Sequence, residues 1–199
     1  MTHEEISQLL QQEAEAILHI PVDESFNAAI DIIVEKVHNH HGKLVTSGMG
    51  KAGQIALNIA TTFSSTGTPA VFLHPSEAQH GDLGVLQTND VMLLISNSGK
   101  TREILELVEL SHHLYDTLPY IVITGNTEST LAALADVVLA TGNPEEVCAL
   151  GLTPTTSTTM MTVIGDVLVV GTMRRINFSR NEYNKRHHGG YLGQKSKGQ

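Results

Sequence analysis

Cysteine and basic residues are scarce in this sequence, and each scarcity excludes a class of protein. Among 199 residues there is one cysteine, Cys148, so no disulfide can form within the chain. Lysine and arginine together number 12 against 21 acidic residues, which gives a formal net charge of -9. Proteins that bind nucleic acid need a cationic surface for the phosphate backbone. We therefore expect no nucleic-acid partner.

Long hydrophobic runs and targeting signals are also missing from the sequence. The most apolar stretch runs only from Met160 to Met173 and contains Asp166, so it is too short and too polar to cross a bilayer of ordinary thickness. The first five residues, Met1 to Glu5, have neither the basic start nor the apolar run of a signal peptide. We expect a cytoplasmic protein without a membrane span.

Apolar residues make up 41% of the chain, which is enough for the core of one large domain. Residues 1–40 place them at helical spacing, which predicts two amphipathic helices. Beyond residue 42, short runs rich in β-branched residues alternate with helix-length segments, notably 52–63 and 102–114. The runs are 43–47, 69–73, 91–95, 120–123 and 137–140.

This alternation predicts a parallel sheet with crossover helices. We expect an α/β protein, a three-layer α/β/α sandwich with a five-stranded parallel sheet of the flavodoxin-like type, preceded by the two N-terminal helices. A Thr/Ser cluster at 155–159 opens a long apolar helix that ends near Ile176. No linker divides the chain, so we expect a single domain over 1–199. Its parts are the N-terminal helices (1–40), the α/β core (41–178) and a C-terminal helix and tail (179–199).

One candidate ligand loop, Ser47 to Gly53, follows the first predicted strand. It matches the G-x-G-x-x-G spacing of dinucleotide sites, but the second strand ends in Leu73-His74, without the acidic residue that would hold a ribose. The spacing around its lysine does not fit a P-loop either. The loop forms a tight strand-to-helix turn or binds an anion at a helix N-terminus. Its candidate binding residues are Ser47, Gly48, Gly50 and Lys51.

A second candidate loop, Ser96 to Thr101, follows the third predicted strand and carries more hydroxyls than one helix cap requires. In a flavodoxin-like sheet, ligands bind between strands one and three, where the strand order reverses. The two loops together predict a metal-free cradle for a small phosphorylated ligand. The candidate residues in the second loop are Ser96, Asn97, Ser98 and Thr101.

Six segments, in family order, are similar to motifs of the arabinose 5-phosphate isomerases, which are built on a sugar isomerase (SIS) domain. The segments are 48–51, 64–69, 74–84, 96–99, 151–159 and 187–193. Family members commonly add a C-terminal pair of CBS domains, and we expect a short form that lacks them. Three residues depart from the family pattern: Lys100 replaces an acidic residue, Gln54 a histidine and His188 a proline.

The resemblance implies an aldose–ketose isomerase that interconverts ribulose 5-phosphate and arabinose 5-phosphate through an enediolate, at the head of the pathway to the lipopolysaccharide sugar Kdo. It implies catalytic roles for Lys51, His80, Glu103 and His187. We expect Glu103 to take the proton from carbon, the two histidines to move protons between oxygens and open the sugar ring, and Lys51 to bind phosphate or the oxyanion. No cofactor or metal is expected.

Each of these roles has a plainer alternative. The helix dipole favours an acidic residue such as Glu103 in any first helical turn. His80 could be an ordinary surface histidine, and Lys51 a solvated lysine at a helix start. Thr155 and Ser157 could simply cap the long helix, although we expect them to face the same pocket and bind substrate.

The resemblance also implies a homo-oligomer, with a tetramer expected, in which the tail carries His187 into the site of a neighbouring subunit. Kdo or its nucleotide-activated form is a candidate feedback ligand. One alternative is another SIS isomerase, for hexulose 6-phosphate or a heptose phosphate, which the segment 74–84 disfavours. Another is a non-catalytic sugar-phosphate sensor, which would be expected to lack at least one of the four catalytic candidates.

Overall fold

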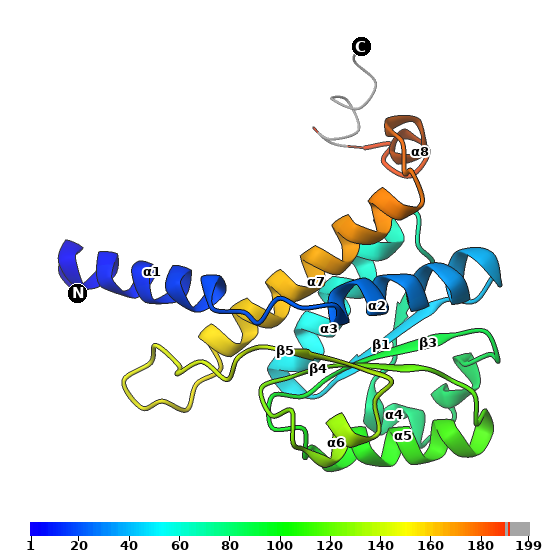
Figure 1. The fold of residues 1–199 in the computed structure, drawn as a ribbon, viewed down its shortest axis with the longest axis horizontal. Coiled ribbons are helices and arrows are strands. Elements are labelled where there is room, and N and C mark those ends of the chain that lie inside the picture. The colour runs from blue at the N-terminus through cyan, green and yellow to red at the C-terminus, as the bar shows by residue number, and fades with distance from the viewer. Residues whose placement is uncertain (190, 192–199) are drawn as a thin grey trace.

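A five-stranded parallel sheet forms the centre of the computed structural model, which describes residues 1–189 and 191 (Figure 1). Its order is β2-β1-β3-β4-β5, and all neighbouring strands are parallel. The strands are β1 (Leu44–Gly48), β2 (Ala70–Phe72), β3 (Val91–Ile95), β4 (Tyr120–Thr124) and β5 (Val137–Ala140). The predicted flavodoxin-like order is confirmed, and each strand lies within one residue of its predicted bounds.

Helices cover both faces of the sheet and complete the three predicted layers. One face carries α2 (Ser25–Ile33), α3 (Gly50–Ser65) and α7 (Thr156–Arg175). The other carries α4 (Pro75–Ala78), the 3-10 turn η2 (Asp82–Val85), α5 (Arg102–Leu114) and α6 (Thr130–Ala133). Each face has its own hydrophobic core, the first beneath α2, α3 and α7 and the second beneath α4, α5 and α6. Successive strand residues point to opposite faces, so Leu93 belongs to the first core and Leu94 to the second. Because both faces are covered, β1, β3 and β4 are buried along their whole length.

The two predicted N-terminal helices are present, but only the second is part of the core. Helix α1 (His3–Leu18) begins with a capping box between Thr2 and Glu5, has no buried residue, and projects away from the sheet (Figure 1). Helix α2 continues into a π-helical turn, η1 (Val34–Asn39), which the sequence pattern did not predict. The apolar side of α1 is therefore left largely in solvent.

Helix α7 corrects the expectation that no segment is long enough to cross a membrane. It continues well beyond the apolar run from Met160 to Met173, and by length and composition alone it could span a bilayer. Half of its most apolar window is nevertheless buried, with Met161, Ile164 and Leu168 packed in the first core. We interpret α7 as a core helix because the same side chains that make it apolar pack against α2 and α3.

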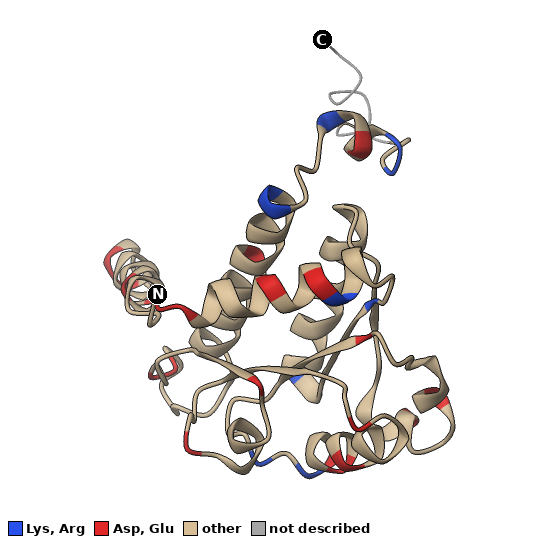
Figure 2. Cartoon of the chain, turned by 45° about the vertical axis from the view of Figure 1, so that its right-hand side comes forward, with Lys and Arg blue, Asp and Glu red and all other residues tan. Residues whose placement is uncertain are grey.

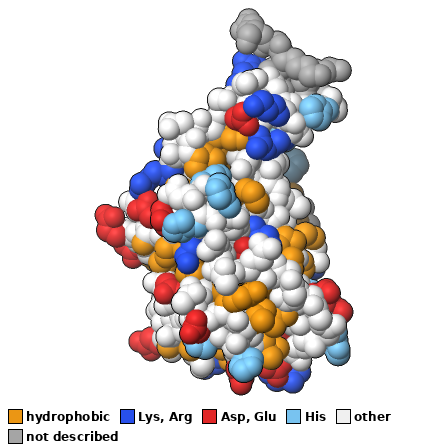
Figure 3. Space-filling model, turned by 90° about the vertical axis from the view of Figure 1, so that its right-hand side faces the viewer, with side chains coloured by type: hydrophobic (Ala, Val, Ile, Leu, Met, Phe, Trp, Pro, Cys, Tyr) orange, Lys and Arg blue, Asp and Glu red, His pale blue; other side chains and the backbone are white. Residues whose placement is uncertain are grey.

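Charged side chains are unevenly distributed over the molecule. Figure 2 shows acidic residues along α1, whereas basic residues gather at the C-terminal end of α7 and around α8 (Arg180–Asn184). At the edge of the sheet where the strands begin, histidine, acidic and basic side chains are interspersed (Figure 3). The cations that concern the candidate site lie at the opposite edge, where the strands end.

Candidate functional site

A cavity of about 620 Å³ lies at the carboxyl ends of the strands. Three helices begin at its wall, namely α3, α5 and α7, so N-terminal backbone N–H groups and the positive ends of helix dipoles face it. The cavity is lined by Met49, Lys51, Ala52, Ile95, Ser96, Asn97, Ser98, Lys100, Thr101, Gly125, Asn126, Asn143, Pro154, Ser157, Thr158 and Met161. It thus lies where the strand order reverses, between β1 and β3, as predicted.

The electrostatics of this cavity favour an anion. Lys51 and Lys100 both line it, and none of the described lining residues is aspartate or glutamate. Neither lysine makes an ion pair or a side-chain hydrogen bond with another residue in 1–189 and 191. In a chain with a net charge of -9, a wall of lysines, hydroxyls and helix N-termini is suited to a phosphate group.

Small residues bring the β1 loop close to the start of α3. A side-chain carbon on Gly48 would lie 2.8 Å from the carbonyl oxygen of Ala52, and one on Gly53 would lie 2.6 Å from the carbonyl oxygen of Gly48. Gly50 has a φ of +57° and opens the helix. Ser47 is fully buried and donates its hydroxyl hydrogen bond to the carbonyl oxygen of Leu73 at 2.6 Å. Ser47 therefore joins β1 to the end of β2, and it is not among the residues that line the cavity.

The β3 loop is held by its own hydroxyls. The hydroxyls of Ser96 and Thr101 lie 2.8 Å apart, and the Gly99 N–H donates to the Ser96 hydroxyl at 3.2 Å. Gly99 has a φ of +62°, and a side-chain carbon there would lie 1.9 Å from the hydroxyl oxygen of Ser129. Only glycine fits this position without movement. The predicted residues Ser96, Asn97, Ser98 and Thr101 are thereby brought together on the cavity wall.

Thr155 and Ser157, the predicted residues at the start of α7, both donate hydrogen bonds to Glu146, which was not predicted from the sequence. The carboxylate of Glu146 accepts the Thr155 N–H at 2.7 Å, the Thr155 hydroxyl at 2.9 Å and the Ser157 N–H at 3.3 Å, and it also accepts the Ser157 hydroxyl. Burial alone would raise the pKa of Glu146, but the hydrogen bonds from Ser157 and Thr155 outweigh it and lower the pKa. The Glu146 side chain therefore caps the N-terminus of α7, where Thr155 is the N-cap residue, and Ser157 lines the cavity whereas Thr155 does not.

Two of the proposed catalytic residues, Glu103 and His80, are not among the residues that line the cavity. Glu103 stands in the first turn of α5, with its side chain 29% exposed and 4.0 Å from Arg102. His80 lies on an exposed loop after α4, and its neighbour Gln79 donates to Glu106 of α5 at 2.7 Å. The loop that carries His80 is thus tied to the first two turns of α5, the helix that carries Glu103.

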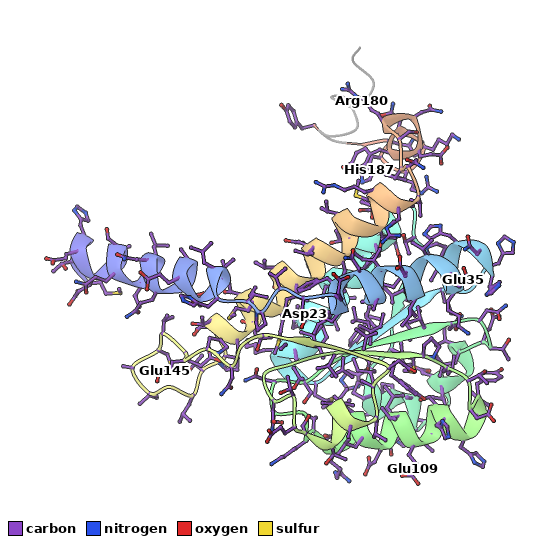
Figure 4. All side chains as sticks on the ribbon, in the orientation of Figure 1. Asp23, Glu35, Glu109, Glu145, Arg180 and His187 are labelled. Atoms are coloured by element: carbon purple, nitrogen blue, oxygen red, sulfur yellow. The ribbon has the colours of Figure 1, made fainter. Side chains whose placement is uncertain are left out.

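His187 lies far from the cavity of its own chain. It follows α8 beyond the C-terminal end of α7, whereas Ser157 is at the N-terminal end, and the twenty residues of α7 span about 30 Å. Figure 4 shows His187 and Glu145 at opposite ends of this helix. The His187 ring stacks on Tyr183 with centroids 3.7 Å apart and contacts the Tyr183 carbonyl through Nδ1. One chain therefore brings together Lys51 and the two loops, but not His187.

Two further asparagines line the cavity and were not singled out from the sequence. Asn126 follows β4 and Asn143 follows β5, so with Asn97 the ends of β3, β4 and β5 each supply one amide. A side-chain carbon on Gly125 would meet the Oδ1 atoms of Asn97 and Asn143 at 2.7 and 3.3 Å, so both amides lie over this glycine. Amides at the ends of successive strands are suited to sugar hydroxyls. Their position shortly after two predicted strands is the sequence signal that could have identified them.

No metal centre accompanies these groups in the described part of the chain. Among residues 1–189 and 191, no group of three histidine, cysteine, aspartate or glutamate side chains could hold a metal ion.

The fold and the cavity define a flavodoxin-like α/β domain with a lysine-bearing cavity at the carboxyl edge of its sheet. Residues 36–171 match the model of the SIS domain, and the chain belongs to the SIS domain family. Its fold, a parallel sheet between helices, is the α/β fold of structures from this family.

Curated relatives carry a specific name. The chain is 43% identical over 188 residues to the arabinose 5-phosphate isomerase KdsD of Yersinia pestis, and 44% identical over 174 residues to that of Escherichia coli strain K12. These alignments cover 94% and 87% of this chain but only 56% and 52% of the relatives. The chain thus spans about half the length of the curated relatives it matches.

Two solved structures match this chain over nearly its whole length. One is a Bacteroides fragilis protein that has been assigned as a phosphosugar isomerase involved in capsule formation. It is 68% identical with a TM-score of 0.93, over 94% of this chain and 98% of that one. An Escherichia coli CFT073 protein solved in complex with arabinose 5-phosphate is 33% identical with a TM-score of 0.84, over 93% and 98% of the two chains.

Proposed function

We propose that this protein is an aldose–ketose isomerase that interconverts D-ribulose 5-phosphate and D-arabinose 5-phosphate. The observation that carries the proposal is the cavity at the strand ends, where Lys51, Lys100 and three helix N-termini face a space without a described carboxylate. Such a wall binds the phosphate, and the strand-end amides are suited to the hydroxyls of the sugar. The name of the KdsD relatives and the arabinose 5-phosphate complex of the Escherichia coli protein support the choice of this sugar phosphate.

Glu103 is the proposed base. Moving a carbonyl between C1 and C2 requires a group that takes a proton from one carbon and returns it to the other. Glu103 is partly buried in the first turn of α5, directly after the loop proposed to bind phosphate. A sugar whose phosphate lies on that loop can extend its C1–C2 end toward α5, because Glu103 follows the cavity residue Thr101 by only two positions. Lys51 helps to hold the phosphate, and a histidine transfers the proton between oxygens.

The distance of His187 from its own cavity supports a site shared between subunits. If His187 takes part in the reaction, it acts in a neighbouring chain, because α7 separates it from the cavity by most of its length. We propose that the protein is a homo-oligomer, a tetramer, whose C-terminal segments are exchanged between sites. Residues 190, 192 and 193 of the predicted tail motif lie outside the described residues.

Two unpaired surfaces of the chain fit each other and support association. Helix α1 exposes Ile6 and Leu10, with 44% and 67% of each residue exposed, on an otherwise acidic helix. Between α2 and α7 there are hollows of about 650 and 350 Å³, which share Phe26 and Val167, and the larger one ends at Arg174. An acidic helix with an apolar stripe matches an apolar groove with a basic end, so these surfaces are the proposed contact between copies.

The biological setting follows from the substrate. The relatives that this chain matches are named as arabinose 5-phosphate isomerases, so we propose a cytoplasmic role at the first step of Kdo formation for lipopolysaccharide. We also propose that Kdo or its nucleotide-activated form binds this domain as a feedback ligand. Calorimetry that detects no binding of either compound would remove the feedback proposal.

A substrate comparison tests the proposed activity. The protein is incubated without added metal with ribulose 5-phosphate, and with the phosphates of hexulose, glucose and sedoheptulose as comparison substrates, while the products are followed by NMR. Turnover confined to the five-carbon pair is expected. Turnover of a six- or seven-carbon sugar instead would favour another isomerase of the SIS family, and phosphate-dependent binding without any turnover would favour a sensor.

A further inference from the structure

Lys100 is the residue of the cavity that the family pattern does not account for. It stands in the β3 loop at a position where arabinose 5-phosphate isomerases usually carry an acidic side chain, yet it lines the same cavity as Lys51. We propose that Lys100 is a second phosphate-binding lysine in this protein, so that the phosphate is held between cations from the β1 and β3 loops. The inference deepens the proposed function and rests on its phosphate site.

The loop fixes the backbone on which Lys100 is carried. The Lys100 N–H donates to the Ser98 hydroxyl at 3.2 Å. The carbonyl oxygen of the preceding Gly99 accepts the Leu131 N–H at 3.2 Å. Gly99 also packs so closely on Ser129 that no side chain fits there. Lys100 therefore projects from a constrained turn between two residues of the cavity wall, Ser98 and Thr101.

Within residues 1–189 and 191, the charges next to Lys100 are paired with other groups. Arg102 is directed to the helix surface, where it meets Glu106 at 3.2 Å and Glu103 at 4.0 Å. Lys100 has no ion pair with any residue of the described part of the chain, and no carboxylate of that part lines the cavity. By contrast, Lys43 is paired with Asp90 at 2.7 Å.

Two unpaired lysines on one concave wall repel each other, and this repulsion is relieved when an anion binds between them. A sugar phosphate carries nearly two negative charges near neutral pH, so it can accept a charge-assisted hydrogen bond from each lysine. The second lysine adds attraction at the phosphate end and none at the reacting carbons. Its loss therefore weakens substrate and transition state equally, which raises KM and leaves kcat unchanged.

The test compares Lys100→Gln with Lys36→Gln, which removes the same charge from η1 at the opposite edge of the sheet. Calorimetry with inorganic phosphate and with arabinose 5-phosphate is expected to show affinity about tenfold weaker for Lys100→Gln and unchanged for Lys36→Gln. In turnover assays KM is expected to rise by a similar factor at constant kcat, and Lys100→Arg to restore most of the affinity.

Phosphate affinity separates this inference from the isomerase proposal. If the wild-type protein binds phosphate but turns over none of the sugars, while Lys100→Gln binds phosphate about tenfold more weakly, the lysine assignment stands and the isomerase proposal fails. Equal phosphate affinity in Lys100→Gln and the wild type would overturn the inference. The same is true of a loss of kcat at constant KM, or of equal losses in the two glutamine variants.

Discussion

The carboxylate of Glu146 accepts the backbone N–H of Thr155 at 2.7 Å and caps helix α7 at the wall of the cavity. The same carboxylate accepts the Thr155 hydroxyl and both the N–H and the hydroxyl of Ser157. A second connection reaches this turn from the N-terminal helix, because the Thr156 hydroxyl donates to Glu13 of α1 at 2.9 Å. The start of α7 is thus fixed from two sides next to the ligand site.

Replacing Glu146 by glutamine is expected to destabilise the protein by about 1–2 kcal/mol, because the amide cannot accept all of these hydrogen bonds. The pKa of Glu146 is lowered from its ordinary 4.5. Its contribution to stability is therefore complete above that value and is lost as the pH falls through the lower folded-state pKa. Thermal unfolding between pH 7 and pH 3 should show a steeper acid loss for the wild type than for Glu146→Gln.

The control for this prediction is Glu145→Gln, since Glu145 is exposed and takes no part in this cap. Equal pH profiles for all three proteins would contradict the assignment of Glu146 as a helix cap.

Gly99→Ala is expected to cost about 2 kcal/mol or more, since the substitution places a side chain at positive φ and against Ser129. It should also weaken phosphate binding, because the β3 loop must shift. Urea unfolding and phosphate calorimetry measure the two effects. Gly84→Ala is the matched control, since an added carbon there meets nothing within 4 Å. Equal stability and phosphate affinity in the two variants would contradict the described loop geometry.

Cys148 is expected to ionise more readily than an ordinary thiol. The backbone N–H groups of Thr153 and Leu152 donate to its Sγ at 3.2 and 3.3 Å and lower its pKa to about 7. The rate of alkylation by iodoacetamide should therefore reach half its maximum near pH 7 in the folded protein, and near pH 8.5, about the value of a free cysteine, in denaturant. A folded-state midpoint equal to the denatured one would show that these N–H groups do not stabilise the thiolate.

Mixing two inactive variants tests whether the site is shared. Glu103→Gln and His187→Ala are each expected to lack activity, and subunits from both are dissociated together and reassembled. If each site takes Glu103 from one chain and His187 from another, about a quarter of the sites are intact in random oligomers. Activity near that fraction of the wild type is the expected result. No recovery in mixed oligomers of confirmed composition would mean that both residues act within one chain.

Much of the fold was predictable because the relevant signals are local. β-branched runs such as Val91–Ile95 alternate with helical segments. This pattern predicted the strand bounds to within one residue and a parallel sheet of flavodoxin-like order. The π-helical turn Val34–Asn39 was not predicted, because its apolar spacing is close to that of the α-helix before it. The 3-10 turn at Asp82–Val85 likewise has no periodic signal.

The candidate site was predictable only as far as residues adjacent to strand ends. The loops after β1 and β3 meet because parallel strands end at one edge, which sequence order alone implies. The cap formed by Glu146 depends on the chain folding back nine residues later onto Thr155, a geometry that no spacing rule contains. The separation of His187 from the cavity likewise depends on the direction of α7 and α8, which only the assembled fold defines.

The most direct test of the account is turnover of ribulose 5-phosphate by the wild type and by two variants of α5. Glu103→Gln removes the proposed base, whereas Glu109→Gln changes an exposed glutamate two turns further along the same helix. Followed by NMR, arabinose 5-phosphate should form with the wild type and with Glu109→Gln. The rate for Glu103→Gln should fall by at least about a hundredfold, while inorganic phosphate still binds. Full activity of Glu103→Gln, or a wild type that binds phosphate and forms no arabinose 5-phosphate, would contradict the account.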